Sequence, residues 1–507
     1  MVLSALAPDP VVEARGMEDS VEGSTSAAST SASPSPQRRK KWIADDTMKD
    51  VEVKTAAGNS SVSIDVSLVS AKNDVERMDA LSMRARELHS EGKIDDAVTW
   101  YENAYAERKR ILGRKHRLTL AEATNLAAAY SDLGNMTKAV QLNEEILAIS
   151  RETLGDDNLG TLHIAHNYAS CLYVARQYHA AALIGTRVYA ARKRLLGQEN
   201  PETLLSANNL VAALADSAQY DEAALLTKEI FEVRRNLFGE NDPSTIATVC
   251  NLAVIRFDQG RIKDAVDINK TGLAACRRVL GKTHPYTMEV VANLADALRA
   301  LGEHAESVAM YEELVLLKDS QFGKSSIEAS DVRGDLAGAL FTQGNYRAAT
   351  AVYANVLSTK QRLLGEDHPS TLHTGHNLAG SLYAEQRYEE AISMYREVHI
   401  TRKIVLGNEH PATQASCENL AGAYMDQANY NDAARLLREL LAVRKRLYGS
   451  ASPLTLETTD AFARARQYQG KRRTGDGDGD DGGASSRSSG KRRAGCNRTK
   501  NMLSGCM

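Results

Sequence analysis

Residues 368–409 read HPSTLHTGHNLAGSLYAEQRYEEAISMYREVHITRKIVLGNE, and this 42-residue segment recurs along most of the chain. A glycine near its end marks every copy: Gly113, Gly155, Gly197, Gly239, Gly281, Gly323, Gly365, Gly407 and Gly449 lie 42 residues apart. Self-similarity at a fixed period of this length is typical of a solenoid, in which each repeat buries its hydrophobic face on its neighbours. The sequence therefore predicts a repeat array.

The start of each repeat carries a helix signal. Proline recurs in one column, at Pro201, Pro243, Pro285, Pro369, Pro411 and Pro453. Proline suits the first turn of a helix, and it pushes the residue before it out of helical geometry. Asn200, Asp242 and Ser452 precede three of these prolines, and such side chains cap helix N-termini. We therefore expect a helix to begin at this column.

Two amphipathic runs follow within the repeat. Leu372, Leu378 and Leu382 recur at helical spacing in the first run, and Ala391 and Tyr395 do so in the second. A short break separates the two runs, with glycine there in several copies. Each repeat is therefore predicted to be an antiparallel pair of helices joined by a tight turn.

The segment NLAGSLYAEQRYEEAISMY, with its HPST entry and RKIVLG exit, resembles the tetratricopeptide repeat in the 42-residue form of kinesin light chains. The resemblance covers roughly residues 74–470. It implies an all-α, right-handed superhelical solenoid whose first helices line a concave groove. It also implies a non-catalytic adaptor of the cargo-adaptor type, which binds extended peptide segments of partner proteins in that groove.

The same resemblance bears on partners and localisation. It implies a cytoplasmic protein, with association with the cytoskeleton as one option. Kinesin light chains bind the kinesin heavy chain through an N-terminal heptad coiled coil. Residues 1–73 show no heptad pattern, which argues against this partner.

Composition divides the chain into three parts. Residues 1–73 are rich in Ser and Pro, residues 74–470 hold nine repeats and a C-terminal capping helix, and residues 471–507 are rich in Gly, Asp, Lys and Arg. Such terminal segments bury too little apolar surface to offset chain entropy, so both are predicted to be disordered tails.

Charge and cysteine content exclude several classes. A net charge of −3 gives no general attraction to nucleic acid or membranes, and no apolar run is long enough to cross a bilayer. The 6 cysteines lie far apart, without metal-ligand or disulfide-framework spacing, so we expect reduced thiols in a cytosolic protein. No phosphate loop, nucleophile elbow or HExxH motif occurs, which predicts neither a cofactor nor an enzyme.

The candidate binding site is a column of asparagines on the first helix of the repeat. Its members are Asn125, Asn167, Asn209, Asn251, Asn293, Asn377 and Asn419. Asparagine is a mediocre helix former, so this recurrence needs a reason. The resemblance implies that these amides face the groove and bond the backbone of a bound peptide. Alternatively, each amide bonds the neighbouring repeat and stitches the array together. Both roles remain open.

The surroundings of this column restrict the ligand. Aspartate stands seven residues later at Asp132, Asp216, Asp258 and Asp426, and Asp216 and Asp258 join the candidate site. No Lys or Arg occupies the position four residues before the column, where relatives that grip a carboxylate carry one. We therefore expect neutral or basic peptide segments. His163/His166 and His373/His376 form pairs, but two histidines are an incomplete metal set, and no metal site is predicted.

The sequence supports three further expectations. A basic column ends the second helix, at Lys109, Arg151, Lys193, Arg235, Arg277, Lys403 and Lys445, and complements the helix dipole. Residues 326–367 break the repeat pattern, with Ser326-Ile327 at the entry and Asp335 in the asparagine column. This break predicts a seam or hinge there, and the alternative is sequence drift with the fold intact. The alternative to a peptide-binding adaptor is a self-associating scaffold that uses the faces of the array for assembly.

Overall fold

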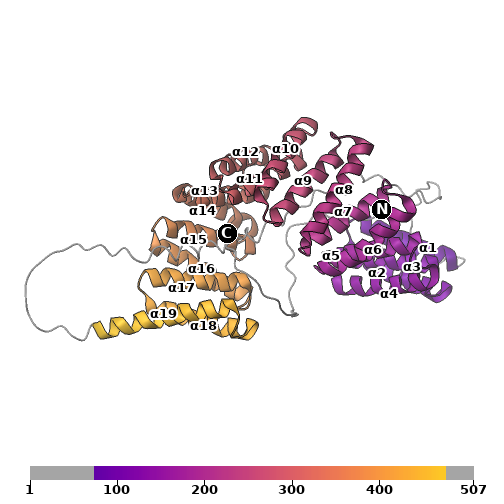
Figure 1. Ribbon diagram of the computed structural model, residues 1–507. Helices are drawn as coiled ribbons and strands as arrows, with labels where there is room; N and C mark the ends of the chain where they lie inside the picture. The colour runs from indigo at the N-terminus through magenta and orange to yellow at the C-terminus, as the bar shows by residue number, and fades with distance from the viewer. Residues whose placement is uncertain (1–73, 476–507) are drawn as a thin grey trace, which may run out of the picture. The chain divides into compact units, whose positions relative to one another are not determined.

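The computed structural model describes residues 74–475, and these residues form helices and no strand. The chain divides into two compact units between Gly281 and Lys282. Figure 1 labels the helices of both units. The helices of the first unit are α1 (Asp74–Ser90), α2 (Ile94–Leu112), α3 (Arg117–Asp132), α4 (Met136–Leu154), α5 (Leu159–Val174), α6 (Tyr178–Leu196), α7 (Pro201–Asp216), α8 (Tyr220–Phe238), α9 (Pro243–Asp258) and α10 (Ile262–Val279).

The second unit continues the same pattern of helices. Its members are α11 (Pro285–Leu301), α12 (His304–Phe322), α13 (Ile327–Thr342), α14 (Tyr346–Leu364), α15 (Pro369–Ala384), α16 (Tyr388–Val405), α17 (Pro411–Asp426), α18 (Tyr430–Tyr448) and α19 (Pro453–Gly475). Each repeat contributes one helix pair, and α19 is a single additional helix that packs on α18.

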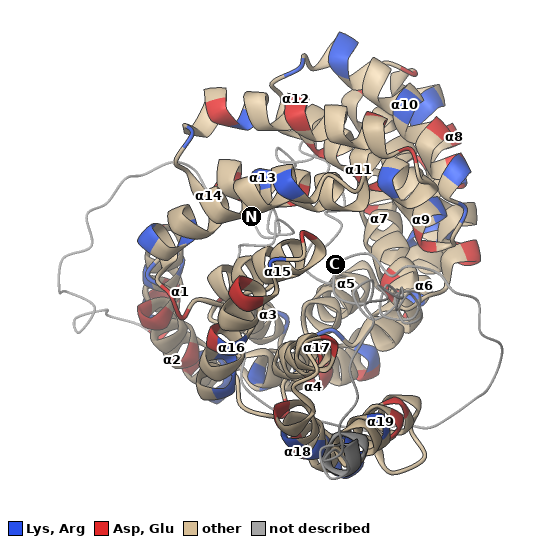
Figure 2. Ribbon diagram, turned by 90° about the vertical axis from the view of Figure 1, so that its left-hand side faces the viewer, with Lys and Arg blue, Asp and Glu red and all other residues tan. Residues whose placement is uncertain are grey.

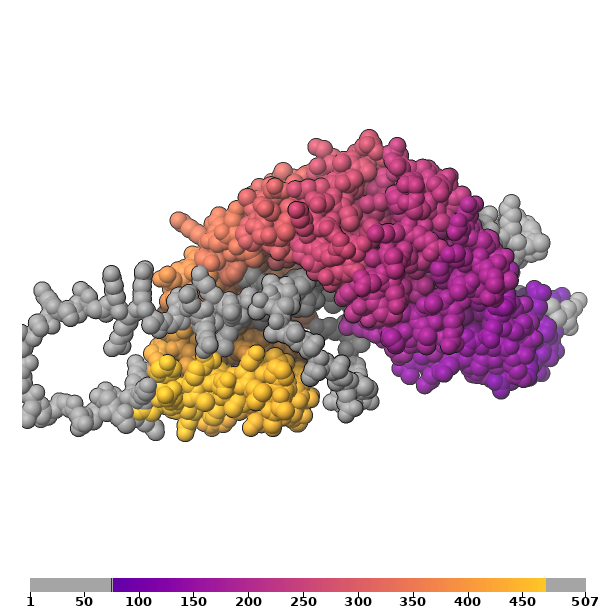
Figure 3. Space-filling view, viewed as in Figure 1, coloured from indigo at the N-terminus to yellow at the C-terminus, as the bar shows by residue number. Residues whose placement is uncertain are grey.

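Within each unit, every helix packs on the one before it and the one after it. First helices of successive repeats also touch directly, α3 on α5 and α5 on α7 in the first unit and α13 on α15 in the second. In the space-filling view, the repeats of the first unit lie against one another in chain order, from indigo to magenta (Figure 3). The prediction of an all-α array of stacked helical hairpins is confirmed.

Helix starts follow the predicted capping logic. Oδ1 of Asn200 accepts a hydrogen bond from the amide of Glu202 at 2.9 Å, and Asp242 caps α9 in the same way. Histidine fills this role at four other helix starts, which the sequence pattern did not indicate. Nδ1 of His116, His284, His368 and His410 accepts a hydrogen bond from the amide two residues later. A neutral imidazole carries one acceptor nitrogen, so it can satisfy an orphan amide as Asn does.

The repeated glycine ends the second helix for a backbone reason. Gly365 has φ 93° and ψ 165°, and the glycines of the same column in the other repeats also have positive φ. This combination of angles is essentially restricted to glycine. The glycine period is therefore a requirement of the connection from one repeat to the next.

The turn between the two helices of a repeat also needs a left-handed residue. Glycine fills it in five repeats, at Gly92, Gly134, Gly260, Gly302 and Gly344. Arg176, Ala218, Gln386 and Ala428 fill it in the other four, with φ between 58° and 67°. A side chain is strained in this region, so these four turns are destabilised relative to the glycine ones.

A column of buried basic residues joins successive repeats. Arg192 donates to the carbonyl of Glu202 at 3.1 Å and to Oγ of Ser206 at 2.7 Å. Arg234 repeats both bonds one repeat later, at 3.1 Å to the carbonyl of Ser244 and 2.8 Å to Oγ1 of Thr248. Both side chains are fully buried. Each arginine therefore fastens the end of one repeat to the first helix of the next.

This column is one residue earlier than the basic column noted in the sequence. Arg192 is buried whereas Lys193 is partly exposed and pairs with Glu229. Five cations of this column, Arg192, Arg234, Lys360, Arg402 and Arg444, are followed fourteen residues later by Ser206, Thr248, Thr374, Ser416 and Thr458. Arg108 and Lys318 are followed instead by Glu122 and Val332, and the uncharged Ser150 and Cys276 by Ile164 and Val290. At Arg192, Arg234 and Arg444 the hydroxyl accepts a hydrogen bond from the guanidinium.

The break predicted within residues 326–367 does not coincide with the division of the chain. In the second unit, α12 packs on α13, α13 on α14 and α14 on α15 in unbroken succession. Ser326 replaces proline but caps α13, accepting from the amide of Ala329 at 3.1 Å. The division falls after Gly281 instead.

The predicted tails lie mostly outside the described residues. Residues 1–73 are outside the described range, as are residues 476–507. The last helix, α19, runs from Pro453 to Gly475.

Candidate functional site

The asparagine column lies on the first helices of the repeats. In the first unit Asn125, Asn167, Asn209 and Asn251 belong to α3, α5, α7 and α9, and in the second Asn293, Asn377 and Asn419 belong to α11, α15 and α17. Asn419 is buried, and the other six are half-buried. Asn293 differs in that its buried Nδ2 has no hydrogen-bond partner among the described residues.

Two of these amides bond the repeat before their own. Nδ2 of Asn209 donates to Oγ of Ser170 at 3.2 Å and lies 3.4 Å from Nε2 of His166, both on α5. In the second unit, Nδ2 of Asn419 lies 3.0 Å from Nε2 of His376 on α15. At these two positions the column connects successive first helices.

Two other amides bond within their own helix. Nδ2 of Asn167 lies 3.4 Å from Nε2 of His163, and Nδ2 of Asn377 lies 3.1 Å from Nε2 of His373. The two histidine pairs singled out in the sequence therefore act as acceptors for the asparagine column. Among residues 74–475 there is no group of three potential metal-binding side chains.

Burial keeps these histidines neutral. Desolvation, followed by the charge of Arg192, lowers the pKa of His166 to about 3. Desolvation and the charge of Arg402 lower the pKa of His373 to about 4, and they lower that of His376 well below its usual value. A neutral imidazole retains one acceptor nitrogen, which the asparagine Nδ2 can use.

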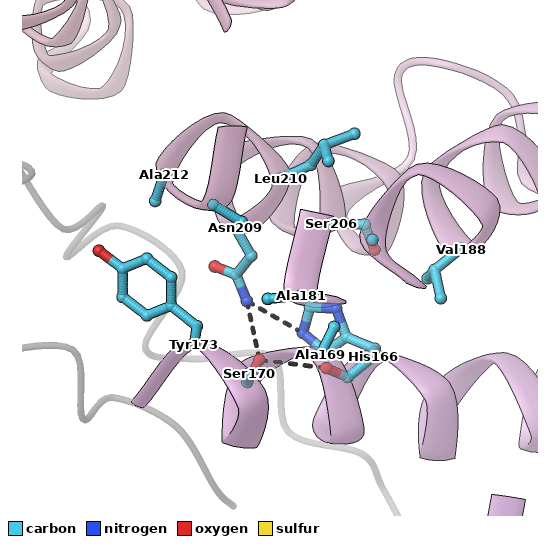
Figure 4. Close-up of a pocket in the computed structure, with 12 residues that line it drawn as sticks. His166, Ala169, Ser170, Tyr173, Ala181, Val188, Ser206, Asn209, Leu210 and Ala212 are labelled. Carbon is cyan, nitrogen blue, oxygen red and sulfur yellow. Dashed lines mark hydrogen bonds between the residues drawn. The ribbon is translucent and has the colours of Figure 1, made fainter. Parts of the chain in front are cut away.

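This arrangement gives the amides a fixed orientation. In Asn167, Asn209, Asn377 and Asn419 the nitrogen is the atom that faces a histidine. The amide oxygen of Asn209 makes none of these contacts, and Figure 4 shows it on the side of Tyr173. An amide held by its nitrogen presents an acceptor, which suits a backbone N–H.

The neighbouring aspartates are engaged by side chains of the preceding repeat. Oη of Tyr173 donates to Oδ2 of Asp216 at 2.5 Å, and Tyr383 contacts Asp426 in the same way. Asp216 is exposed beyond this contact, and Asp258 is half-buried. No pattern in the sequence indicated these hydroxyl bonds across the repeat junction.

A small pocket lies directly beside Asn209. Residues of three helices line it (Figure 4). They are His166, Ala169, Ser170 and Tyr173 of α5, Ala181, Gly185 and Val188 of α6, and Ser206, Asn209, Leu210, Ala212 and Ala213 of α7. The lining is apolar except for a few polar groups, among them His166, Ser170 and Asn209. No sequence signal noted above indicated this pocket, although Gly185 is a departure from its column.

Family models match the chain across both units. One tetratricopeptide repeat model matches residues 119–194, 244–315 and 328–399, and a second matches residues 77–118, 203–244 and 413–454. Together they cover most of the helical array. The chain belongs to the tetratricopeptide repeat family. No curated protein matches it.

Solved structures with the same kind of repeat are similar to this tetratricopeptide repeat protein. The nearly identical repeats of a protein named as a kinesin light chain from Podosopora anserina share 25% identity, cover 40% of this chain and 95% of that one, and give a TM-score of 0.38. BtubC (BKLC) from P. vanneervenii shares 19% identity, with 54% and 99% covered and a TM-score of 0.34.

A third similar structure is a Signal Transduction ATPase with Numerous Domains from Pyrococcus horikoshii, whose sensor is a tetratricopeptide repeat region. It shares 13% identity with this tetratricopeptide repeat protein, covers 69% of this chain and 53% of that one, and gives a TM-score of 0.42.

The surface of the array shows mixed charge. Figure 2 shows Lys and Arg interspersed with Asp and Glu along the helices of this tetratricopeptide repeat protein. Many of these charges form ion pairs, such as Arg194 with Asp157 and Arg446 with Glu409. Within residues 74–475, no helix has the length and apolar character needed to span a bilayer.

Proposed function

We propose that this tetratricopeptide repeat protein is a non-catalytic adaptor that binds extended peptide segments of partner proteins along the first helices of its repeats. The observation that carries the proposal is the orientation of the asparagine amides. The nitrogens of Asn167, Asn209, Asn377 and Asn419 face histidines, and this leaves an acceptor oxygen on each amide. A backbone N–H of an extended segment is the natural donor for such an oxygen.

This assignment unites the two roles that the sequence left open. The nitrogen of Asn209 stitches α7 to α5, whereas its oxygen is offered to a ligand. Asp216 and Asp258 lie seven residues beyond asparagines of the column. Carboxylates and acceptor oxygens favour N–H groups and cationic side chains, so neutral or basic peptides are the ligand class we propose.

The proposal places the protein in the cytoplasm. Cys171, Cys250, Cys276 and Cys417 are buried free thiols, as suits a reducing compartment. No metal, cofactor, nucleic acid or membrane surface enters the proposed function. The cargo-adaptor role of kinesin light chains stays a prediction from the sequence resemblance.

The test compares a double variant in the asparagine column with a variant of an asparagine outside it. Peptides would be selected by display on the whole chain, and their affinities measured by fluorescence anisotropy. The double variant Asn209→Ala/Asn251→Ala is expected to weaken binding about tenfold or more, since each lost hydrogen bond to a peptide is worth roughly 1 kcal/mol. Asn236→Ala, on the exposed side of α8, is the matched control. Equal affinities for the double variant and the parent protein would refute the proposal.

A second candidate function is self-association through the second helices. Leu183 on α6 and Leu225 on α8 occupy the same position of successive repeats, and they are 55% and 69% exposed. Repeated exposed leucines on one face favour a protein contact. Light scattering across a concentration series tests this function: a mass that rises with concentration, and that Leu183→Gln/Leu225→Gln holds at the monomer value, supports assembly.

A further inference from the structure

The pocket beside Asn209 exists because one repeat lacks a side chain that the others have. The column of Gly185 contains Tyr101, Asn143, Gly185, Thr227, Asn269, Tyr311, Tyr353, Tyr395 and Leu437. Tyrosine is its commonest residue, and Tyr101, Tyr311, Tyr353 and Tyr395 are all buried. Gly185 is the one member that fills no space beyond the backbone.

The tyrosines of this column contact the histidine and asparagine positions described above. In the eighth repeat the ring of Tyr395 lies edge-on to that of His376, with 5.3 Å between centroids. Burial raises the pKa of Tyr353, and a side-chain hydrogen bond with Asn377 partly offsets that rise. A phenol in this column therefore meets both an imidazole and an amide of the first helices.

The third repeat keeps those partners without the phenol. His166 stands at the position of His376, and Asn209 at the position of Asn377. Gly185 replaces the tyrosine, and Ser170 stands where the eighth repeat has Gly380. In that repeat a Cβ on Gly380 would lie 3.3 Å from Oη of Tyr395. Leu210 packs closely on Gly185: its Cδ1, Cβ and Cα lie 3.3, 3.7 and 3.8 Å from where a Cβ on Gly185 would stand. Leu210 therefore takes up part of the space that a tyrosine would fill, and the pocket is the space that remains beside it.

We propose that this pocket receives the phenol side chain of a tyrosine from the peptide segment bound along α5 and α7. This inference rests on the proposed function and names a specificity pocket within it. Three polar groups of the lining, His166, Ser170 and Asn209, lie next to one another, and Ala169, Ala181, Val188 and Leu210 add apolar surface (Figure 4). Such a lining suits a ring with one hydroxyl.

The size of the pocket decides how the ring enters. The pocket holds about 380 Å³ of empty space, a volume that includes solvent at its open mouth, and its interior has room for about one water-sized group. The hydroxyl end therefore enters first and the ring stands in the mouth beside Tyr173. The hydroxyl donates to the oxygen of Asn209, whose nitrogen is already held by Ser170.

The experiment uses p-cresol, the side-chain analogue of tyrosine, titrated into the whole chain. Methyl-resolved NMR would follow Val188, Leu210 and Ala213. We expect saturable shifts at these methyl groups, and binding about tenfold weaker for toluene, which lacks the hydroxyl bond. Gly185→Asn is expected to abolish the shifts, because asparagine fills this column at Asn143 and Asn269. Thr227→Asn in the next repeat is the matched control and should leave them unchanged.

A second variant keeps the proposal testable if Gly185→Asn does not fold. Asn209→Leu removes the acceptor but keeps the approximate size, and it should reduce the preference for p-cresol over toluene from about tenfold to about one. Absence of p-cresol shifts in the parent protein, or shifts that persist in Gly185→Asn, would overturn the pocket. So would an unchanged preference in Asn209→Leu.

The two proposals can fail separately. Displayed peptides that require Asn209 but bind equally well after replacement of their tyrosine by alanine, and equally well to Gly185→Asn, would overturn the tyrosine pocket and leave the peptide-binding function intact. Saturable p-cresol binding without any peptide binding would overturn the proposed function and, with it, the peptide as the source of the phenol.

Discussion

Nδ2 of Asn419 lies 3.0 Å from Nε2 of His376, so an amide on α17 is bonded to an imidazole on α15 of the preceding repeat. The same pair of positions is linked in the first unit, where Asn209 faces His166 at 3.4 Å. The two residues are 43 apart in the chain in both cases, one more than the repeat length. A bond of this kind links the first helices of two successive repeats, and its strength can be measured.

Replacement of His376 by phenylalanine should destabilise the second unit. The ring keeps its approximate shape, but Nδ2 of Asn419 loses its acceptor in a buried site, which costs about 1–3 kcal/mol. The measurement is urea unfolding followed by circular dichroism. In a double-mutant cycle with Asn419→Leu, we expect a coupling of about 1 kcal/mol. Additive effects of the two substitutions would show that the contact contributes nothing to stability.

The buried histidines make stability fall in acid. The folded-state pKa of His166 is about 3 and that of His373 about 4, below the usual 6.5, so the folded protein binds fewer protons than the unfolded chain between these limits. Their contribution is present above pH 6.5 and is lost as the pH falls towards the folded pKa. We expect a loss of about 2 kcal/mol per histidine between pH 6.5 and about pH 5.

This pH dependence has a direct control. His166→Gln removes the titrating group, so denaturant unfolding at pH 7 and pH 5 should differ less for this variant than for the parent protein. His179→Gln, at an exposed position, should leave the difference unchanged. A parent protein equally stable at both pH values would contradict the assignment of neutral buried imidazoles.

Glycine should stabilise the turns that lack it. Ala218 and Gln386 have φ of 62° and 67°, where a side chain is strained and glycine is not. Each change to glycine is expected to raise the free energy of unfolding by about 1 kcal/mol, after its own entropic cost. Thermal melting checks the direction. Gly134→Ala, the reverse change at the same turn position in another repeat, should lower the melting temperature.

The contribution of the arginine column to stability can be tested by copying into it the pair Ser150 and Ile164 of another repeat. Arg234→Ser should destabilise the first unit by about 2–4 kcal/mol, because the hydroxyl of Thr248 and the carbonyl of Ser244 lose a buried donor. The double variant Arg234→Ser/Thr248→Ile copies the pair Ser150 and Ile164, and it should recover part of the loss. Equilibrium urea unfolding measures both. A double variant no more stable than the single one would contradict the pairing.

Local chemistry explains why so much of the fold could be predicted. The proline and cap at the start of a repeat, the hydrophobic period within it and the glycine at its end each act over a few residues. Gly365, for example, requires its own backbone angles whatever the neighbouring repeat does. Nine copies of these local sequence signals predict the helices. The helix pairs are expected to stack because one pair cannot bury its own apolar face.

The sequence by itself determined the stacked helical pairs, the column at which each repeat begins and the asparagine column. Tertiary structure decided that Arg192 rather than Lys193 is buried, because the packing of a helix pair selects one of two adjacent basic residues. It also decided that the nitrogen of Asn209 faces Ser170 and His166, and that Gly185 leaves a pocket where Tyr395 fills one elsewhere. These features depend on groups from different helices, from 10 to 43 residues apart in the chain, meeting in space. Only the packed repeats bring such atoms within hydrogen-bond distance.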